Sequence, residues 1–232
     1  MESYLEQKGF DLSRVKFSSV MSTVYLWMSI GLGITGLTAW YTSNSVWLLT
    51  AIFSNIAVFY MLIIFELVLV LAFRAILNKA NYMVALCCFM VYSVVNGLTL
   101  ASIFLLYTST SIASTFFITG GTFMAMSAYG YLTKKDLSGW GSYLMMGVIG
   151  LIIASVVNIF FQNDMFTFLV SAVGIVIFIG LTAYDTQKIK ENLETATSEE
   201  AVNKVTIYGA LILYLDFVNL FLKLLRILGR RK

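Results

Sequence analysis

Residues 170–184 read VSAVGIVIFIGLTAY, a run without a charged side chain. A strand with one exposed face alternates apolar and polar residues, and the strands of a membrane β-barrel do so over about ten residues. This run does not alternate and is apolar on all sides, as a helix surrounded by lipid is. It therefore predicts an α-helix inside a membrane.

Six further apolar runs of the length that crosses a bilayer, about 20 residues, occur along the chain. The composition agrees, because 59% of the 232 residues are hydrophobic and only 12% are charged, about half the charged share of a soluble domain. A water-soluble protein is excluded. The sequence predicts an all-α polytopic membrane protein with seven transmembrane helices, over residues 20–40, 51–73, 83–106, 112–131, 143–161, 166–184 and 206–225.

We expect a cytoplasmic N-terminal segment at residues 1–19, a single transmembrane domain at 20–228 and a basic tail at 229–232. The connections are short except for residues 186–205, which hold three Lys and four Glu. Such a stretch is typical of a solvated loop or a short amphipathic helix. Glycines cluster within the spans, where we expect close helix packing: Gly31, Gly33 and Gly36; Gly120 and Gly121; Gly147 and Gly150.

The loop charges predict the orientation, because Lys and Arg accumulate in cytoplasmic loops. The N-terminal segment and the second, fourth and sixth loops carry them, whereas the first, third and fifth loops carry none. This pattern places the N-terminus in the cytoplasm. The residues concerned are Lys8, Arg14, Lys16, Arg74, Lys79, Lys134, Lys135, Lys188, Lys190 and Lys204.

The C-terminal cations conflict with this orientation. Seven complete spans leave five of them on the far side of the membrane: Lys223, Arg226, Arg230, Arg231 and Lys232. Either the earlier helices set the orientation and the tail tolerates it, or the last segment does not fully cross.

The chain has no histidine, and its two cysteines, Cys87 and Cys88, are adjacent in an apolar run. The missing histidine removes the commonest metal ligand, the usual protease base and the ordinary proton shuttle near neutral pH. Adjacent residues on a helix point about 100° apart. We expect the cysteines to be packing residues rather than a disulfide or a metal site.

Three acids fall in or at the ends of the spans: Glu66, Asp185 and Asp216. A charged side chain deep in a bilayer costs at least about 2.5–3.5 kcal/mol, so each needs a partner, water or neutralisation. Glu66 is too far from Arg74 for a direct helical pair, and we expect its partner on another helix and its side chain inside the bundle. Asn96, Asn158 and Asn219 also lie in spans, where such residues mainly link helices.

Asp185 and Asp216, on consecutive predicted helices, suggest a coupled pair. Two carboxyl groups within hydrogen-bond distance cannot both stay ionised without a cation, so they share a proton or bind a metal. Oxygen ligands without histidine favour a hard ion such as Ca²⁺. Counting 1.5 Å per residue, however, places Asp216 roughly 12–15 Å deeper than Asp185. A tilted seventh helix, a sixth helix that begins deeper or a water-filled cleft would reconcile the two depths.

Several longer motifs follow one another along the chain from about residue 20 onward: NGLTLASIF at 96–104, YT at 107–108, SIASTF at 111–116, YGY at 129–131, TKKDLS at 133–138, GLTAYDTQ at 180–187 and LDFVNLF at 215–221. Together they resemble the Bax inhibitor-1 family, in its bacterial inner-membrane branch. The resemblance implies six helices around a central C-terminal seventh and a proton-regulated calcium leak.

The resemblance also implies roles for individual residues. Asp185 and Asp216 match the two aspartates of the family's di-aspartyl pH sensor, which gates the ion path and is the candidate Ca²⁺ site. Arg74 lies near the arginine latch of some members, although not clearly in register. Glu66 corresponds to an acidic position earlier in the same helix, and Glu66 and Asn219 are candidate supporting polar groups.

The leading hypothesis is a pH-sensitive calcium or cation leak channel or exchanger in a bacterial inner membrane, and not an enzyme. An intramembrane aspartyl protease is disfavoured, because Leu213-Tyr214-Leu215-Asp216 lacks the Gly-x-Gly-Asp of such enzymes and the chain has no proline. A regulator that binds another membrane protein, such as a quality-control protease, stays open. The expected partners are lipid, calcium ions, protons and such a protein, with no cofactor and no nucleic acid.

Overall fold

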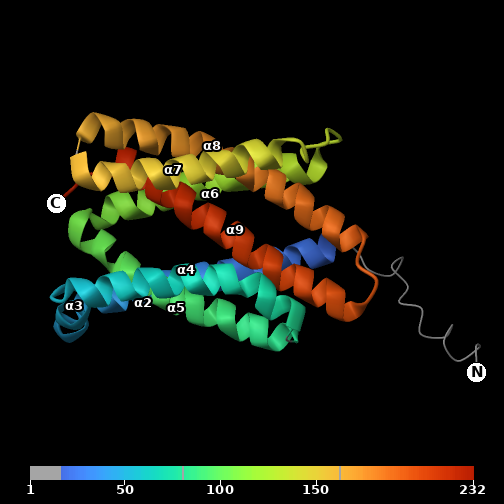
Figure 1. The fold of residues 1–232 in the computed structure, drawn as a ribbon, viewed down its shortest axis with the longest axis horizontal. Coiled ribbons are helices and arrows are strands. Elements are labelled where there is room, and N and C mark those ends of the chain that lie inside the picture. The colour runs from blue at the N-terminus through green and yellow to red at the C-terminus, as the bar shows by residue number, and fades with distance from the viewer. Residues whose placement is uncertain (1–16, 80, 162) are drawn as a thin grey trace, which may run out of the picture.

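The computed structural model describes residues 17–79, 81–161 and 163–232, so the expected segment 1–19 lies largely outside the described residues. Five helices start at a Ser, Thr or Asn whose side chain accepts a bond from the backbone N–H three residues later, which satisfies a donor that the helix cannot. The helices are α2 (Phe17–Asn44), α3 (Val46–Phe53), α4 (Ile56–Lys79), α5 (Tyr82–Leu106), α6 (Ser109–Leu132), α7 (Trp140–Phe161), α8 (Asp164–Glu194) and α9 (Glu199–Leu228) (Figure 1).

Six of these helices are long and apolar enough to cross a membrane: α2, α4, α5, α7, α8 and α9. The all-α membrane class is thereby confirmed. The predicted span at residues 112–131 corresponds to α6, which has 24 residues and a length of about 36 Å at 1.5 Å per residue. Its many Ser, Thr and Gly residues lower its mean hydropathy, and it is not among the six.

The helices form two groups with α9 between them. Figure 1 shows α6, α7 and α8 on one side, α2, α4 and α5 on the other, and α9 running obliquely across the middle. α9 packs against α2, α5, α6 and α8. In its most apolar stretch 61% of the residues are buried, compared with 6% in α4 and α7. The core of the bundle is thus built around α9.

The structure corrects the second predicted span, residues 51–73. The chain breaks at Ser54 and Asn55, because the Asn55 side chain accepts a hydrogen bond from the Ala57 amide at 3.0 Å and thereby starts a new helix. The Ser54 amide bonds to the Thr50 carbonyl at 3.1 Å and ends α3. The apolar stretch of membrane length is therefore Ile56–Phe73.

Residues 186–205, expected to form a solvated loop or a short amphipathic helix, are mostly helical but belong to two long helices. α8 continues through the charged residues to Glu194, and α9 already begins at Glu199, so only residues 195–198 connect them. Asp185 accordingly lies within a helix and not at its end. Because α9 also begins earlier than expected, the mismatch in depth stays: Asp185 lies nine residues before the end of α8 and Asp216 seventeen residues after the start of α9, a difference of about 12 Å at 1.5 Å per residue. The oblique course of α9 across the bundle in Figure 1 agrees with the tilted last helix that would reconcile the two depths.

The outer helices expose the side chains that lipid prefers. Many Ile, Leu, Val, Met and Phe side chains of α4 and α7 are exposed. Trp40, Trp47, Trp140 and Tyr143 near helix ends are exposed too, at positions typical of an aromatic belt. Cys87 is exposed, Cys88 is half-buried and both are free, which confirms that they form no disulfide.

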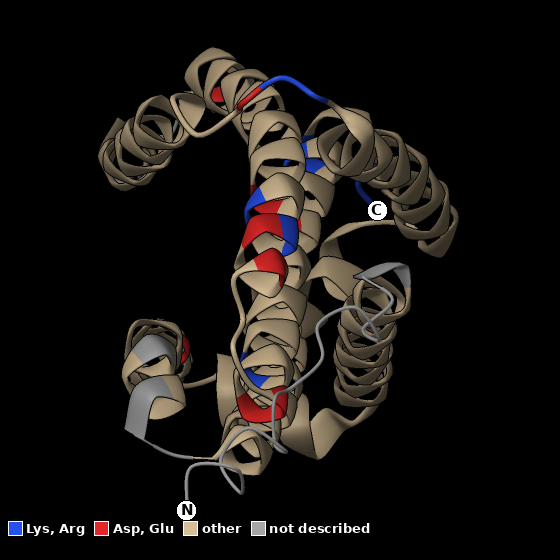
Figure 2. Cartoon of the chain, turned by 90° about the vertical axis from the view of Figure 1, so that its right-hand side faces the viewer, with Lys and Arg blue, Asp and Glu red and all other residues tan. Residues whose placement is uncertain are grey.

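Charges gather at one end of the bundle, which contains residues 133–139 and 195–198 and is called the loop end below. Figure 2 looks onto this end and shows the charged segments concentrated along the middle of the bundle, with mostly tan helices around them. The ion pairs between described residues lie here, with Lys188 and Glu191 3.2 Å apart and Lys204 and Glu200 3.0 Å apart. The opposite end, with residues 106–108 and the C-terminus, is called the tail end.

Candidate functional site

Asp185 of α8 and Asp216 of α9 come together between their helices. Each carboxyl group is the side-chain hydrogen-bond partner of the other. Asp216 is only 5% exposed, and Asp185 is half-buried. The structure thus brings together the two aspartates that the sequence predicted as a pair.

The contact between the two carboxyl groups limits their charge. An ionised carboxylate only accepts hydrogen bonds, so a bond between two carboxyl groups requires a proton on one of them. Among the described residues, no Lys or Arg contributes to the electrostatics of either group. The pair therefore holds one proton in this arrangement, and loss of that proton leaves two negative charges in a buried place.

The residues around the pair do not form a complete metal site. Among the described residues, no group of three or more His, Cys, Asp or Glu side chains could hold a metal ion. Ca²⁺ prefers six to eight oxygen ligands. Two carboxyl groups alone would leave most of its ligands to water or to other oxygen atoms.

Hydroxyl groups connect the α8 segment around Asp185 to its neighbours. Ser127 of α6 lies 2.8 Å from the Thr186 hydroxyl and 2.7 Å from the Tyr25 hydroxyl of α2. The Thr182 and Thr186 hydroxyls also donate to the carbonyls four residues earlier in α8. The helix that carries Asp185 is therefore joined to α6 by a buried hydroxyl contact, and through Ser127 to α2.

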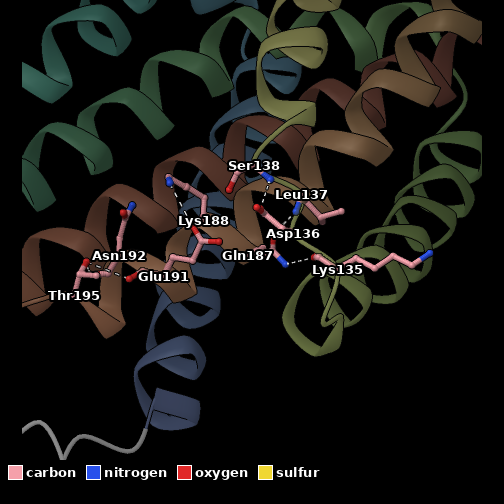
Figure 3. A network of polar contacts seen from close by, with 9 residues as sticks. All are labelled: Lys135, Asp136, Leu137, Ser138, Gln187, Lys188, Glu191, Asn192 and Thr195. Atoms are coloured by element: carbon pink, nitrogen blue, oxygen red, sulfur yellow. Dashed lines mark hydrogen bonds and ion pairs between the residues drawn. The ribbon is translucent and has the colours of Figure 1, made fainter.

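Gln187 joins α8 to the loop between α6 and α7. Its side-chain amide donates to the Lys135 carbonyl at 2.9 Å and its oxygen accepts from the Leu137 amide at 2.8 Å. Figure 3 shows this side chain directed at the loop, beside the turn in which Asp136 accepts from the Ser138 amide at 2.8 Å. This clamp, two residues after Asp185, was not predicted. The sequence feature that could have indicated it is the polar pair TQ at the end of the motif GLTAYDTQ.

A second polar cluster lies on the other side of α9. Glu66 of α4 accepts from the Asn96 amide at 3.1 Å and from the Thr99 hydroxyl at 2.8 Å, both on α5. Asn96 in turn accepts from the hydroxyl of Tyr214 at 3.0 Å, and that hydroxyl lies 2.6 Å from the hydroxyl of Thr35 on α2. The cluster links four helices, and it confirms that Glu66 has its partners on another helix.

This cluster borders a cavity of about 550 Å³ between α4, α5 and α9. Glu66, Asn96 and Thr99 line its inner part, and Tyr107 and Arg226 lie at its outer part. Asn219 also lines the cavity and donates to the Leu215 carbonyl of its own helix at 2.8 Å. Asn219 therefore belongs to this cavity, which neither Asp185 nor Asp216 lines.

The remaining predicted residues have different outcomes. The backbone of Arg74 lies in α4, but its side chain lies outside the described residues, so its proposed role as a latch stays a prediction. Asn96 and Asn158 do link helices, the latter by donating to Thr167 of α8 at 2.6 Å. Tyr214 was not identified from the sequence, because a tyrosine in an apolar run is ordinary. Its position two residues before Asp216 was the one signal that could have identified it.

Comparison with known proteins extends the resemblance to the whole described chain. The family described as "Inhibitor of apoptosis-promoting Bax1" matches residues 17–232. The inner membrane protein YbhL of Escherichia coli K12 is 47% identical over 221 residues, 94% of each chain. An uncharacterized protein of Borreliella burgdorferi is 47% identical over 213 residues, 91% of this chain and 92% of its own, and protein RP147 of Rickettsia prowazekii is 42% identical over 212 residues, 91% and 89%.

Proposed function

The chain belongs to the Bax inhibitor-1 family, and from this premise we propose that it is a pH-sensitive cation leak pathway, with Ca²⁺ as the ion and Asp185 with Asp216 as the gate. The observation that carries the proposal is the contact between the half-buried Asp185 and the buried Asp216, which requires a shared proton. This is transport and not enzyme chemistry.

The gate follows from the charge of the pair. While the proton is shared, the two carboxyl groups hold α8 and α9 together. Once it leaves, two like charges in a low-dielectric place repel each other strongly. That charge is relieved when a cation enters or when the helices move apart and admit water. Either route couples the proton to the passage of a cation.

The proposal also assigns the membrane arrangement. α6 is the seventh span, because it is long enough to cross and packs against α8 and α9. α9 is then the central helix, and the Lys and Arg residues of the loop end place that end in the cytoplasm of a bacterium. Glu66 and Asn219 supply polar groups to the cavity on the other side of α9, and Arg74 is the candidate cation that offsets the negative charge of the deprotonated pair.

Calcium flux into liposomes tests the proposal. The purified protein is reconstituted, and entry of Ca²⁺ is followed with a trapped indicator from about pH 5 to about pH 8. A single titrating group changes its ionised fraction by up to about tenfold per pH unit, so we expect the flux to vary by this order. Asp216→Asn and Asp185→Asn should each make the profile flat, and the double variant should add little, since the pair acts as a unit.

Asp136→Asn is the matched control, because Asp136 is a carboxylate in the loop near the pair. The Ser138 backbone amide, and then its side chain, donate to Asp136 and lower its pKa. A lowered pKa keeps the group ionised at neutral pH, and its contribution to stability is present above the ordinary pKa and lost only as the pH falls through the lowered value. The control should keep the pH profile of the wild type.

Absence of flux in folded wild-type protein would instead favour the regulator that binds another membrane protein.

A further inference from the structure

The structure resolves where the C-terminal cations lie. α9 ends at Leu228, and residues 229–232 reach the turn between α5 and α6 at the tail end (Figure 1). Five cations lie in the last ten residues of the chain, whereas Asp164 at the start of α8 is the acidic side chain that the described part of the chain places at this end. Such a surplus opposite the N-terminus departs from the usual distribution of Lys and Arg and calls for a partner of negative charge.

The tail is fixed by its backbone. The Arg230 carbonyl accepts from the Thr108 amide at 3.1 Å, and the Lys232 amide donates to the Leu106 carbonyl at 2.9 Å. The Arg230 amide donates to the Ser111 hydroxyl at 3.0 Å. Gly229 lies so close to Tyr107 that a β-carbon at this position would overlap the tyrosine ring. The arginines of the tail are thus held in place without the use of their guanidinium groups.

The guanidinium groups stay exposed to the surroundings. Arg226, Arg230 and Arg231 are exposed, and the ion pairs between described residues lie at the loop end. Lys232 differs, because its ammonium group donates to the Phe104 carbonyl at 2.7 Å, near the C-terminal end of α5, where positive charge is favourable. Three exposed arginines therefore lie within six residues of the chain at the tail end.

An apolar wall adjoins this surface. Arg226 lines the outer part of the cavity between α4, α5 and α9 together with Leu106, Leu222 and Leu225, and Phe59 of α4 faces it from the other side. The polar residues of the cavity lie deeper, about one to two helical turns further in for Asn219 and Thr99. A free phosphate would meet only the arginines, whereas a phospholipid would also cover the leucines.

We propose that Arg226, Arg230 and Arg231 bind the phosphate of an anionic phospholipid, whose acyl chain covers the apolar wall at the outer part of this cavity. Guanidinium groups bind phosphate oxygens in a bidentate manner. A lipid with a net negative charge also matches the surplus of cations, which a zwitterionic lipid does not. The lipid is a structural partner of the tail end, independent of any ion flux.

Thermal unfolding of the full-length protein in mixed micelles tests this site. Phosphatidylglycerol should raise the midpoint by several degrees more than the same amount of phosphatidylcholine. The variant R226Q/R230Q/R231Q should lose most of that difference, and because the tail is bound through its backbone it should still fold. If the triple variant does not fold, the single variants R230Q and R231Q replace it in the test, and each should lose part of the midpoint difference between the two lipids.

The control variant K134Q/K135Q/K188Q removes three exposed cations at the loop end and should keep the difference between the two lipids. Equal loss in this control would show a general effect of net charge and overturn the site. An equal midpoint shift with inorganic phosphate in phosphatidylcholine micelles would show a plain anion site and overturn the assignment to a lipid. Equal stabilisation of the wild type by the two lipids would also overturn the assignment to an anionic lipid.

Discussion

Single glycines decide how closely the helices approach the carboxyl pair. Gly130 of α6 faces the backbone of Ala183, and Gly141 of α7 faces the ring of Tyr184, the two residues before Asp185. The glycine clusters in the sequence predicted only part of this packing. Gly31 and Gly147 do meet neighbours, whereas Gly33, Gly36, Gly120, Gly121 and Gly150 have open space around them. The sequence alone does not tell which face of a helix meets another helix.

Gly130→Ala should destabilise the protein. Its β-carbon would overlap the Ala183 carbonyl, which belongs to the rigid backbone of α8 and cannot turn aside. Forced packing of this kind costs about 1–3 kcal/mol. Unfolding by heat or denaturant in detergent measures the loss.

Gly120→Ala is its control, because Gly120 lies in the same helix with nothing within 4 Å of the added atom. There the change should be neutral or stabilising by up to about 1 kcal/mol, since alanine favours a helix more than glycine does. Equal effects of the two substitutions would contradict the close contact between α6 and α8.

Acidic residues were the best sequence signals at this scale. The cost of a carboxylate in lipid predicted that Glu66 faces inward, and its bonds to Asn96 and Thr99 confirm it. The same reasoning singled out Asp185 and Asp216. Hydroxyl and amide groups such as Tyr214 and Gln187 were missed, because they cost little in an apolar helix and so stand out less.

Among the helices, α8 departs most from its prediction. Hydropathy ends the span at Tyr184, but the helix continues through TQKIKENLE to Glu194. A hydropathy pattern reports where lipid ends and not where hydrogen bonding ends. Beyond the apolar part, Ile189 and Leu193 are buried, and Ile189 packs against Gly209 of α9. Apolar residues four positions apart, here Ile189 and Leu193, indicate a helix within the charged stretch.

Gln187→Ala should loosen the loop between α6 and α7 from α8. The Leu137 amide loses its acceptor, and a typical hydrogen bond contributes about 0.5–1.5 kcal/mol. Hydrogen exchange at Leu137 should therefore accelerate by up to about tenfold. Mass spectrometry of exchanged peptides from residues 133–139 measures it.

Lys188→Ala provides the comparison at the neighbouring position. It removes an exposed ion pair with Glu191, which contributes little to stability. Exchange in the loop should stay as in the wild type. If both variants accelerate exchange equally, the clamp is not Gln187.

For the molecule as a whole, the charge pattern of the loops and the arrangement of the helices agree. The loop at residues 133–139 carries Lys134 and Lys135, and the helix ends on either side of residues 195–198 carry Lys188, Lys190 and Lys204. These lysines lie at the loop end, and the tail lies opposite (Figures 1 and 2). The order of apolar runs gave the number of long helices. It could not give the break at Ser54 or the packing around α9, because these depend on contacts between distant parts of the chain.

Cysteine labelling in intact cells should show that α6 crosses the membrane. In a C87A/C88A background, Ser138→Cys and Thr197→Cys should react only from the cytoplasmic side. Ser54→Cys and Ser109→Cys should react only from the outside, since each of these four residues is exposed at a helix end. The reagent is a thiol compound that does not cross the membrane, applied before and after permeabilisation.

The pair at positions 109 and 138 isolates α6, because these residues flank that helix alone. Labelling of both from one side would mean that α6 does not cross. Labelling of Thr197→Cys from the outside would reverse the orientation of the whole bundle.

Tyr214 and Asp216 are two residues apart, about 200° around α9, so they face nearly opposite sides of one rod. Asp216 touches Asp185, and Tyr214 touches Asn96 and Thr35. A roll of α9 by about 20° would shift atoms at its outer radius by roughly 2 Å, more than a hydrogen bond tolerates. α9 therefore couples the two polar clusters mechanically, because rotation of this rigid helix moves Tyr214 and Asp216 together. Neither cluster can rearrange by rotation of α9 without disturbing the other.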